Sequence, residues 1–206
     1  MADHRVFAKL RSLLFVAIPA VLKGSDIGEP ITILRLNYYD SHAPCAYLDF
    51  RCLSNSTCDA IVAKRGAAAF DWLWGSGEEC GKRLRISLPS DPENSSDKSD
   101  LAACFRKVYR LLSNERKFMP QYRRCLQAVA YELNQFDWTA TLSVTDGFVI
   151  VPADGSMYFC DDESEIVCSV PPEKLTFYLD RGYLSAIDLQ RGEQSGSLKR
   201  RWWRFG

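Results

Sequence analysis

Histidine is scarce in this sequence. Only His4 and His42 occur among the 206 residues, although a serine or cysteine nucleophile normally needs a neighbouring base, most often an imidazole. His42 lies close to Cys45 in a predicted turn, where a Cys–His dyad competes with a plain exposed turn. We favour the exposed turn, so the sequence predicts no catalytic residue.

Metal and cofactor motifs are also missing. The chain has eight cysteines, but no two of them have the Cys-x-x-Cys spacing of a zinc site or redox pair. The segment GSGEECGKR comes nearest to a phosphate-binding loop, yet Ser76 stands where the first glycine is required and Arg83 follows the lysine. We therefore expect no metal and no cofactor, and we interpret Cys104 and Cys125 as buried, reduced thiols.

No apolar run reaches the ~20 residues that are needed to cross a bilayer. Residues 1–20 nevertheless have the order of a signal peptide, because Arg5, Lys9 and Arg11 precede the apolar run Leu13–Leu22. The alternative is an amphipathic helix that is bent or ended at Pro19. We favour the helix, since the apolar spacing already begins among the basic residues, and we expect a cytoplasmic protein without a membrane span.

The sequence has no net charge, because Lys and Arg number 26 and Asp and Glu also number 26. A global field that would attract nucleic acid or an anionic membrane is therefore not expected. The charges are nevertheless separated along the chain. Seven basic residues and one acidic residue lie between 106 and 124, whereas eight acidic residues and one basic residue lie between 141 and 180. This pattern predicts a bipolar surface.

Hydrophobic periodicity predicts helices and strands through most of the chain. Residues 31–52 have the alternation of a β-hairpin with one covered face, around a turn at 40–44. The other elements predicted before residue 138 are a helix from Ser56 or Thr57 to about Trp74, a strand KRLRISLP, a mobile loop at 89–100, and an antiparallel pair of helices that begin at Asp100 and near Pro120.

Two Asp-Gly pairs, at 146–147 and 154–155, flank the apolar run FVIVPA. Asp-Gly is a strong signal for a tight hairpin turn, so WTATLSV, FVIVPA and SMYFC are predicted as strands of a β-meander, with EIVCSV as a candidate fourth strand and PPEKLTFYLDRGYL as a closing helix. We therefore expect an α+β fold. One domain over residues 1–184 would contain a largely antiparallel sheet covered by helices, and a basic, aromatic tail would follow at 185–206.

Candidate interaction residues lie in two places. The acidic group DDESE lacks the alternating oxygen ligands of a calcium loop, which favours a solvated turn. The tail SLKRRWWRFG mixes cations with aromatic rings, which suits base stacking, a membrane surface, a partner's groove, or packing back on the body of the protein. The predicted partner-binding residues are Asp154, Asp161, Asp162, Glu163, Glu165, Trp202 and Trp203.

The order of elements resembles a group of bacterial immunity-like proteins that are encoded beside polymorphic or contact-delivered toxins. The resemblance covers residues 5–184 and rests on the N-terminal amphipathic helix, the hairpin LNYYD…CAYLDF, the helix end FDWLW, and FVIVPAD followed by PPEKLTFYLDRGYL. It implies a protein without catalytic residues that neutralises a toxin by binding it.

Three functions can be compared on these grounds. The leading hypothesis is an immunity or inhibitor protein whose acidic residues between 141 and 180 and exposed aromatic residues occlude a toxin, with opposite charges steering the encounter. The second is a nucleic-acid-binding accessory protein that uses the basic helices at 106–124 and the tail at 199–205. The third is an enzyme of unrecognised type, for which the candidates are Asp146, Asp154 and Cys45.

Overall fold

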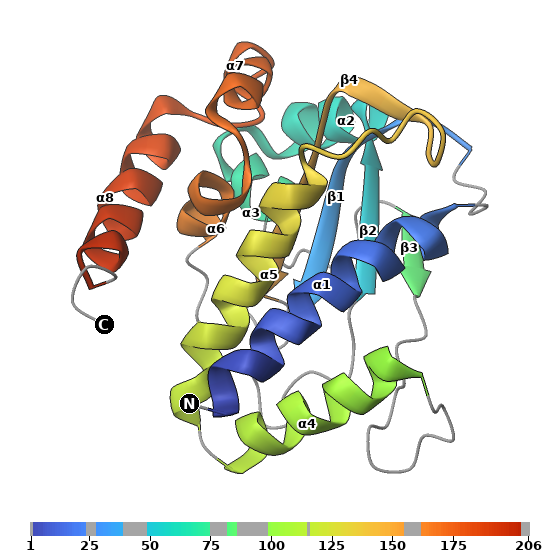
Figure 1. Cartoon of the computed structure of the whole chain (residues 1–206). Coiled ribbons are helices and arrows are strands. Elements are labelled where there is room, and N and C mark those ends of the chain that lie inside the picture. The colour runs from blue at the N-terminus through green and yellow to red at the C-terminus, as the bar shows by residue number, and fades with distance from the viewer. Residues whose placement is uncertain are drawn as a thin grey trace.

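A mixed four-stranded sheet lies at the centre of the computed structural model, which describes residues 2–23, 28–38, 49–74, 82–85, 99–114, 116–154 and 162–202 (Figure 1). The strands are β1 (Ile31–Tyr38), β2 (Asp49–Ser54), β3 (Lys82–Arg85) and β4 (Val144–Asp154), in the spatial order β3-β2-β1-β4. The helices are α1 (Ala2–Leu22), α2 (Asn55–Arg65), η1 (Gly66–Ala68), α3 (Ala69–Leu73), α4 (Asp100–Asn114), η2 (Arg116–Phe118), α5 (Met119–Leu133), α6 (Asp162–Ser169), α7 (Pro172–Asp180) and α8 (Ala186–Trp202). The α+β class predicted from the sequence is confirmed.

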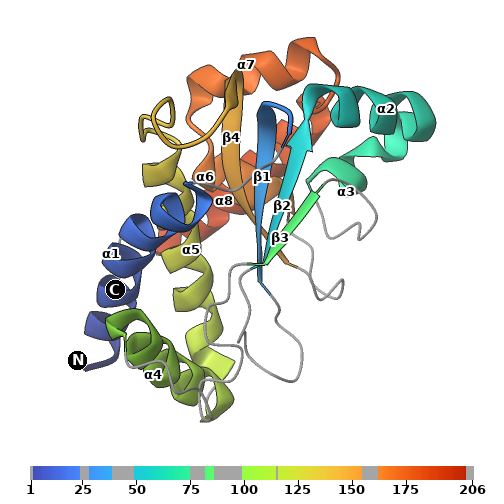
Figure 2. The same ribbon diagram turned by 90° about the vertical axis from the view of Figure 1, so that its right-hand side faces the viewer.

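Helices cover both faces of this sheet. Figure 2 shows the sheet nearly edge-on, with α1, α4 and α5 on one side and α2 and α3 on the other. Leu34 and Leu36 of β1 join the apolar cluster under α1, α4 and α5, whereas Ile33 joins the cluster that contains Trp74 of the opposite layer. The antiparallel pairing of β1 and β2 is confirmed, and the predicted turn at 40–44 lies outside the described residues. The expectation of one covered face is wrong, because every residue of β1 is buried.

The predicted N-terminal helix is confirmed as α1. It does not end at Pro19 but continues to Leu22. Leu10, Leu14 and Leu22 have no exposed surface, and the helix packs against both α4 and α5. Val21, near the C-terminal end of the helix, is 44 % exposed.

The helices predicted from Asp100 and near Pro120 are confirmed as α4 and α5. Both lie against α1, and η2 connects the end of α4 to the start of α5 (Figure 1). Cys104 and Cys125 are buried free thiols, as predicted. Burial raises the pKa of Cys125 to about 12, so its thiol stays protonated at neutral pH.

The predicted C-terminal meander is wrong. One strand, β4, contains the first Asp-Gly pair and pairs with β1 in parallel, so the sheet is mixed rather than largely antiparallel. The segment EIVCSV lies mostly in α6 instead of a strand. WTATL precedes β4 in a turn, and SMYFC lies outside the described residues.

Gly147 has a packing role in place of the predicted turn. Its φ is not among the positive values, which occur at Gly28, Gly66 and Gly182 in the described residues. The ring of Phe177 in α7 lies against its Cα, where a Cβ atom would overlap with the ring. The neighbouring Tyr178 hydroxyl donates to the carbonyl oxygen of Gly147 at 2.5 Å. Glycine is therefore required here by the close approach of α7 to β4.

We expect Gly147→Ala to lower the free energy of unfolding by about 1–3 kcal/mol, because the added methyl group overpacks a rigid contact. Chemical denaturation followed by tryptophan fluorescence measures this loss. The same substitution in a Phe177→Leu background should cost clearly less, since the smaller side chain can move aside. Equal losses in the two backgrounds would contradict the proposed overlap.

Side chains protect the free edge of β4. Ile150 has both backbone polar groups bound by the Asn134 side chain, with its N–H donating to Oδ1 at 2.7 Å and its carbonyl accepting from Nδ2 at 2.8 Å. The Lys174 ammonium donates to the carbonyl of Phe148 at 2.8 Å, and burial lowers its pKa. An open strand edge is a template for aggregation, so these two residues complete the sheet.

The predicted tail begins as a helix. Residues 186–202 form α8, which packs against α6. Leu189 joins the apolar cluster of the α2 and α3 layer, whereas 62 % of the Ile187 side chain is exposed. The closing helix predicted at 171–184 is confirmed as α7, with Gly182 at φ 68° after its end.

Candidate functional site

A groove of about 960 Å³ lies between α1 and the C-terminal end of α5. We call it the α1/α5 groove. Phe15 and Phe136 provide bulky apolar walls, and Val16 is 70 % exposed at its margin. A concave surface with aromatic walls and a few charged groups is the usual form of a binding site. The groove is lined by Ala8, Arg11, Ser12, Phe15, Val16, Glu132, Gln135, Phe136 and Asp137.

The groove contains one ion pair. The Arg11 guanidinium donates through Nε to Glu132 Oε2 at 3.2 Å and through Nη2 to Oε1 at 2.5 Å. This two-point contact with the carboxylate raises the pKa of Arg11. Because both side chains are partly exposed, the pair contributes little to stability, but it links α1 to α5 with a two-point contact.

Asp137 adds a further negative charge at the end of the groove. Its Oδ1 accepts from the backbone N–H of Thr139 at 3.0 Å and from the Thr139 hydroxyl at 2.7 Å. These hydrogen bonds lower the pKa of Asp137, so the carboxylate is ionised at neutral pH. The charges of Arg11, Glu132 and Asp137 together leave the groove with one net negative charge.

The apolar wall of the groove is anchored in the core. Phe15 contacts Phe136 edge-to-face with ring centroids 6.1 Å apart, and Phe136 contacts Trp138 in the same manner at 5.0 Å. Trp138 in turn contacts Phe148 of β4 at 5.5 Å. Such a chain of aromatic contacts holds the wall in one conformation, which reduces the entropy lost when a ligand binds.

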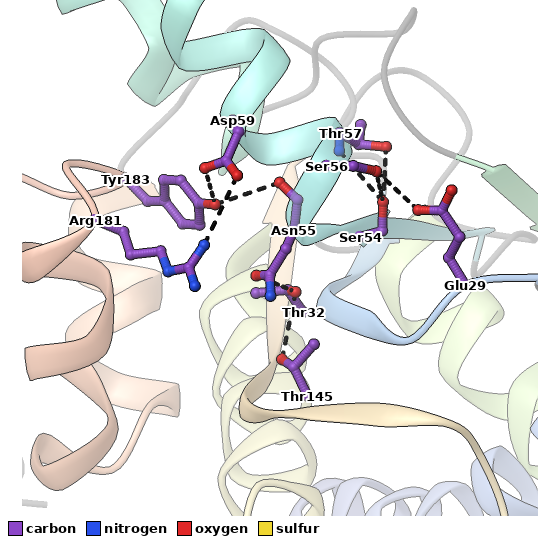
Figure 3. Close-up of polar contacts among 10 residues, drawn as sticks. All are labelled: Glu29, Thr32, Ser54, Asn55, Ser56, Thr57, Asp59, Thr145, Arg181 and Tyr183. Atoms are coloured by element: carbon purple, nitrogen blue, oxygen red, sulfur yellow. Dashed lines mark hydrogen bonds and ion pairs between the residues drawn. The ribbon is translucent and has the colours of Figure 1, made fainter.

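A second polar cluster surrounds the start of α2 (Figure 3). The helix is capped by Ser54, whose hydroxyl accepts from the N–H of Thr57 at 3.3 Å, so the cap is two or three residues earlier than predicted. Thr32 of β1 donates to the amide oxygen of Asn55 at 2.7 Å and accepts from Thr145 of β4 at 3.3 Å. These hydrogen bonds join α2 to both strands.

Tyr183 extends this cluster towards α7. Its hydroxyl donates to Asp59 Oδ1 at 2.5 Å, and Arg181 lies 3.7 Å from the other carboxylate oxygen, as Figure 3 shows. Burial and the hydrogen bond to Asp59 raise the pKa of Tyr183. A phenol that holds its proton more tightly is less useful as an acid, so the geometry favours a structural clamp between α2 and the loop after α7.

The third polar cluster is at the C-terminal end of β1. Glu165 of α6 is 2 % exposed, although the sequence placed it on an acidic surface. Its carboxylate accepts from the Tyr38 hydroxyl at 3.1 Å and from the amide of Gln127 at 2.7 Å, and Arg123 lies 3.6 Å away. The expected solvated turn is thus wrong at this residue, because a buried carboxylate with such partners joins α5, α6 and β1.

The other predicted partner-binding residues are only partly described. Asp154 is the last residue of β4, Asp162 and Glu163 begin α6, and Trp202 ends α8. Their side chains, and Asp161 and Trp203 entirely, lie outside the described residues, as do Cys45 and His42.

The two candidate catalytic carboxylates are not brought together. Asp146 is exposed near the start of β4 and Asp154 ends the same strand. Their separation is about 26 Å at ~3.3 Å per residue, which is too far for joint acid–base chemistry. Among the described residues, no group of three or more histidine, cysteine or acidic side chains could hold a metal ion.

The basic residues at 106–124 divide into two kinds. Lys107, Arg110 and Arg124 are exposed, as a nucleic-acid surface requires. Arg123 is instead 21 % exposed, and its Nε donates to the Tyr38 hydroxyl at 2.7 Å. Arg123 is therefore committed to contacts inside the protein and is a weaker candidate for a nucleic-acid surface than the three exposed residues.

Comparison with known proteins found no match. No family model matches the chain, and no curated protein or solved structure matches it either. In the part of the chain that the structure describes, no helix is both long enough and apolar enough to cross a membrane.

Sequence reasoning did not find the α1/α5 groove. Its residues come from positions 8–16 and 132–137, and only the fold brings them together. One signal was available: residues 12–22 of the first predicted helix contain no charged side chain, which is unusual for a helix whose outer face meets water.

Proposed function

We propose that this protein is a non-enzymatic binding protein of the immunity or inhibitor type, which neutralises a toxin in the cytoplasm by covering its active surface. The α1/α5 groove is the observation that carries the proposal, because it combines the exposed Val16, a rigid aromatic wall and fixed charges. These are the features of protein-recognition surfaces, in which a few anchored contacts supply most of the affinity.

Two further features support the proposal. The order of sequence elements resembles immunity-like proteins, and the chain concentrates acidic residues between 141 and 180. Asp154, Asp162 and Glu163 are retained as candidate contacts at the ends of β4 and α6, together with Asp161, Trp202 and Trp203. Glu165 is not a candidate contact residue, because its carboxylate is buried.

We expect co-expression of this protein to rescue cells from the product of the adjacent gene. The two proteins should also form a stable complex that survives gel filtration. An unrelated toxin of the same activity serves as the control and should still kill the cells. The combination of no rescue and no complex would refute the proposal.

A nucleic-acid-binding accessory protein is the second candidate. It is favoured by the exposed positions of Lys107, Arg110 and Arg124. In this case the protein would bind RNA or DNA in a strongly salt-dependent manner, since each phosphate contact releases counterions. Binding that weakens when Arg200 and Arg201 become Ala would favour this function over toxin neutralisation.

A further inference from the structure

We infer that the α1/α5 groove receives a helical segment of the partner protein that carries a bulky apolar side chain and an adjacent basic residue. The inference rests on the proposed function, since it names the kind of partner surface that a binding protein of this shape would recognise. It also identifies a contact region distinct from the acidic residues predicted from the sequence.

The apolar part of the groove selects an apolar anchor. Val16 is 70 % exposed, and Phe15 and Phe136 line the same groove. Outer faces of surface helices normally carry charged residues, yet α1 has none from Ser12 to Leu22. An apolar side chain that filled this space would remove water from both surfaces, which is the main source of affinity in such contacts.

The charges of the groove select a cation. Arg11 is already engaged by Glu132, whereas Asp137 is ionised and forms no ion pair with a Lys or Arg among the described residues. A basic residue beside the anchor would meet this carboxylate. An anionic membrane surface fits less well, because lipid phosphates would face Asp137 and Glu132.

The shape of the groove favours a helix. It runs between two helices, and helical ligands commonly place one apolar stripe in a groove of this kind. Ala8 and Val16 are eight residues apart, which corresponds to about 12 Å along α1 at ~1.5 Å per residue. This length accommodates about two turns of a partner helix.

Two synthetic helical peptides test the inference on the full chain. Both carry the same stripe of Leu residues, but the flanking polar positions are Lys in one peptide and Glu in the other. Backbone amide shifts in NMR spectra report where each peptide binds. We expect the Lys peptide to shift amides of α1 and of residues 132–137 in a saturable manner, and the Glu peptide to bind much more weakly. Equal binding of the two peptides, or shifts elsewhere, would overturn the inference.

Matched variants separate the two contributions. Val16→Gln should weaken binding of the Lys peptide about tenfold, because an apolar contact is lost. Asp137→Asn keeps an oxygen for Thr139 while removing the charge, and should weaken binding about threefold. The controls are Ile187→Gln on α8 and Asp180→Asn on α7, which change exposed residues of the same types and should leave the affinity unchanged.

Other occupants give different outcomes. A concentration-dependent dimer that Val16→Gln abolishes would identify a second copy of this chain and overturn the inference. Binding to phosphatidylglycerol vesicles but not to the Lys peptide would do the same in favour of a membrane surface.

The peptide and toxin experiments can refute the inference and the proposed function separately. If the toxin is neutralised equally well by Val16→Gln and Asp137→Asn, the proposed function stands and this inference fails. If the Lys peptide binds in the groove but no toxin is neutralised, the recognition chemistry stands without the proposed function.

Discussion

Asn134→Ala should lower the free energy of unfolding by about 3–5 kcal/mol, because it leaves three buried backbone groups without a partner at ~1–3 kcal/mol each. The side chain is 3 % exposed and binds the N–H and carbonyl of Ile150 and the carbonyl of Ser169 at 2.7–2.8 Å. The Asn134 side chain thus forms the hydrogen bonds with β4 that a neighbouring strand would form, and it also binds the end of α6. Urea denaturation followed by circular dichroism measures the loss.

The neighbouring Gln135 provides the control. It is exposed, and Gln135→Ala should change stability by less than about 0.5 kcal/mol. Asn134→Asp should be as damaging as Asn134→Ala, because a carboxylate cannot donate to the two carbonyl groups. Hydrogen exchange should show that the amide of Ile150 loses protection in Asn134→Ala, whose side chain offers no oxygen to accept its hydrogen bond. An Asn134→Ala protein as stable as Gln135→Ala would contradict this role.

The sequence predicted the elements whose side chains repeat with a clear period. Helices α4 and α5 and the antiparallel pair β1/β2 appear where apolar spacing placed them, because the apolar side chains that repeat along each element must be buried. Cap positions were less accurate, since Ser54 and Ser56 are equally suitable residues for a helix start and only the backbone decides between them.

The region after residue 138 was predicted less well for two physical reasons. An Asp-Gly pair favours a hairpin turn, but at Gly147 the missing side chain serves the close packing of Phe177 instead. A short apolar run such as EIVCSV fits both a strand and a buried helix, and periodicity cannot separate them. In the folded protein, tertiary packing stabilises most of this segment as the helix α6.

Buried polar residues are the hardest to predict. Glu165 belongs to an acidic run, so the sequence alone suggests a solvated position. In the structure this carboxylate is buried because donors distant in the sequence surround it: Tyr38, Arg123 and Gln127. No local sequence pattern reveals such partners. The same limit applies to the α1/α5 groove, which exists only when α1 lies against α5.

Arg123→Met should cost about 3–5 kcal/mol, because it leaves the buried carboxylate of Glu165 without this cation. It also removes the Nε donor that binds the Tyr38 hydroxyl at 2.7 Å. An exposed arginine of α4 gives the control, since Arg110→Met should change stability by less than about 0.5 kcal/mol. Thermal and urea denaturation at neutral pH measure the difference.

A double-mutant cycle shows whether charge or packing causes the loss. In the Arg123→Met background, Glu165→Gln removes the uncompensated charge while keeping an oxygen for Tyr38, so the double variant should be more stable than Arg123→Met alone. In the native background the same substitution removes a charge that Arg123 balances, and it should destabilise the protein. This reversal of sign is expected only if the carboxylate is charged and depends on Arg123. If Glu165→Gln destabilises both backgrounds equally, the cluster acts through shape and hydrogen bonding, and the ion pair contributes nothing to the junction of α5, α6 and β1.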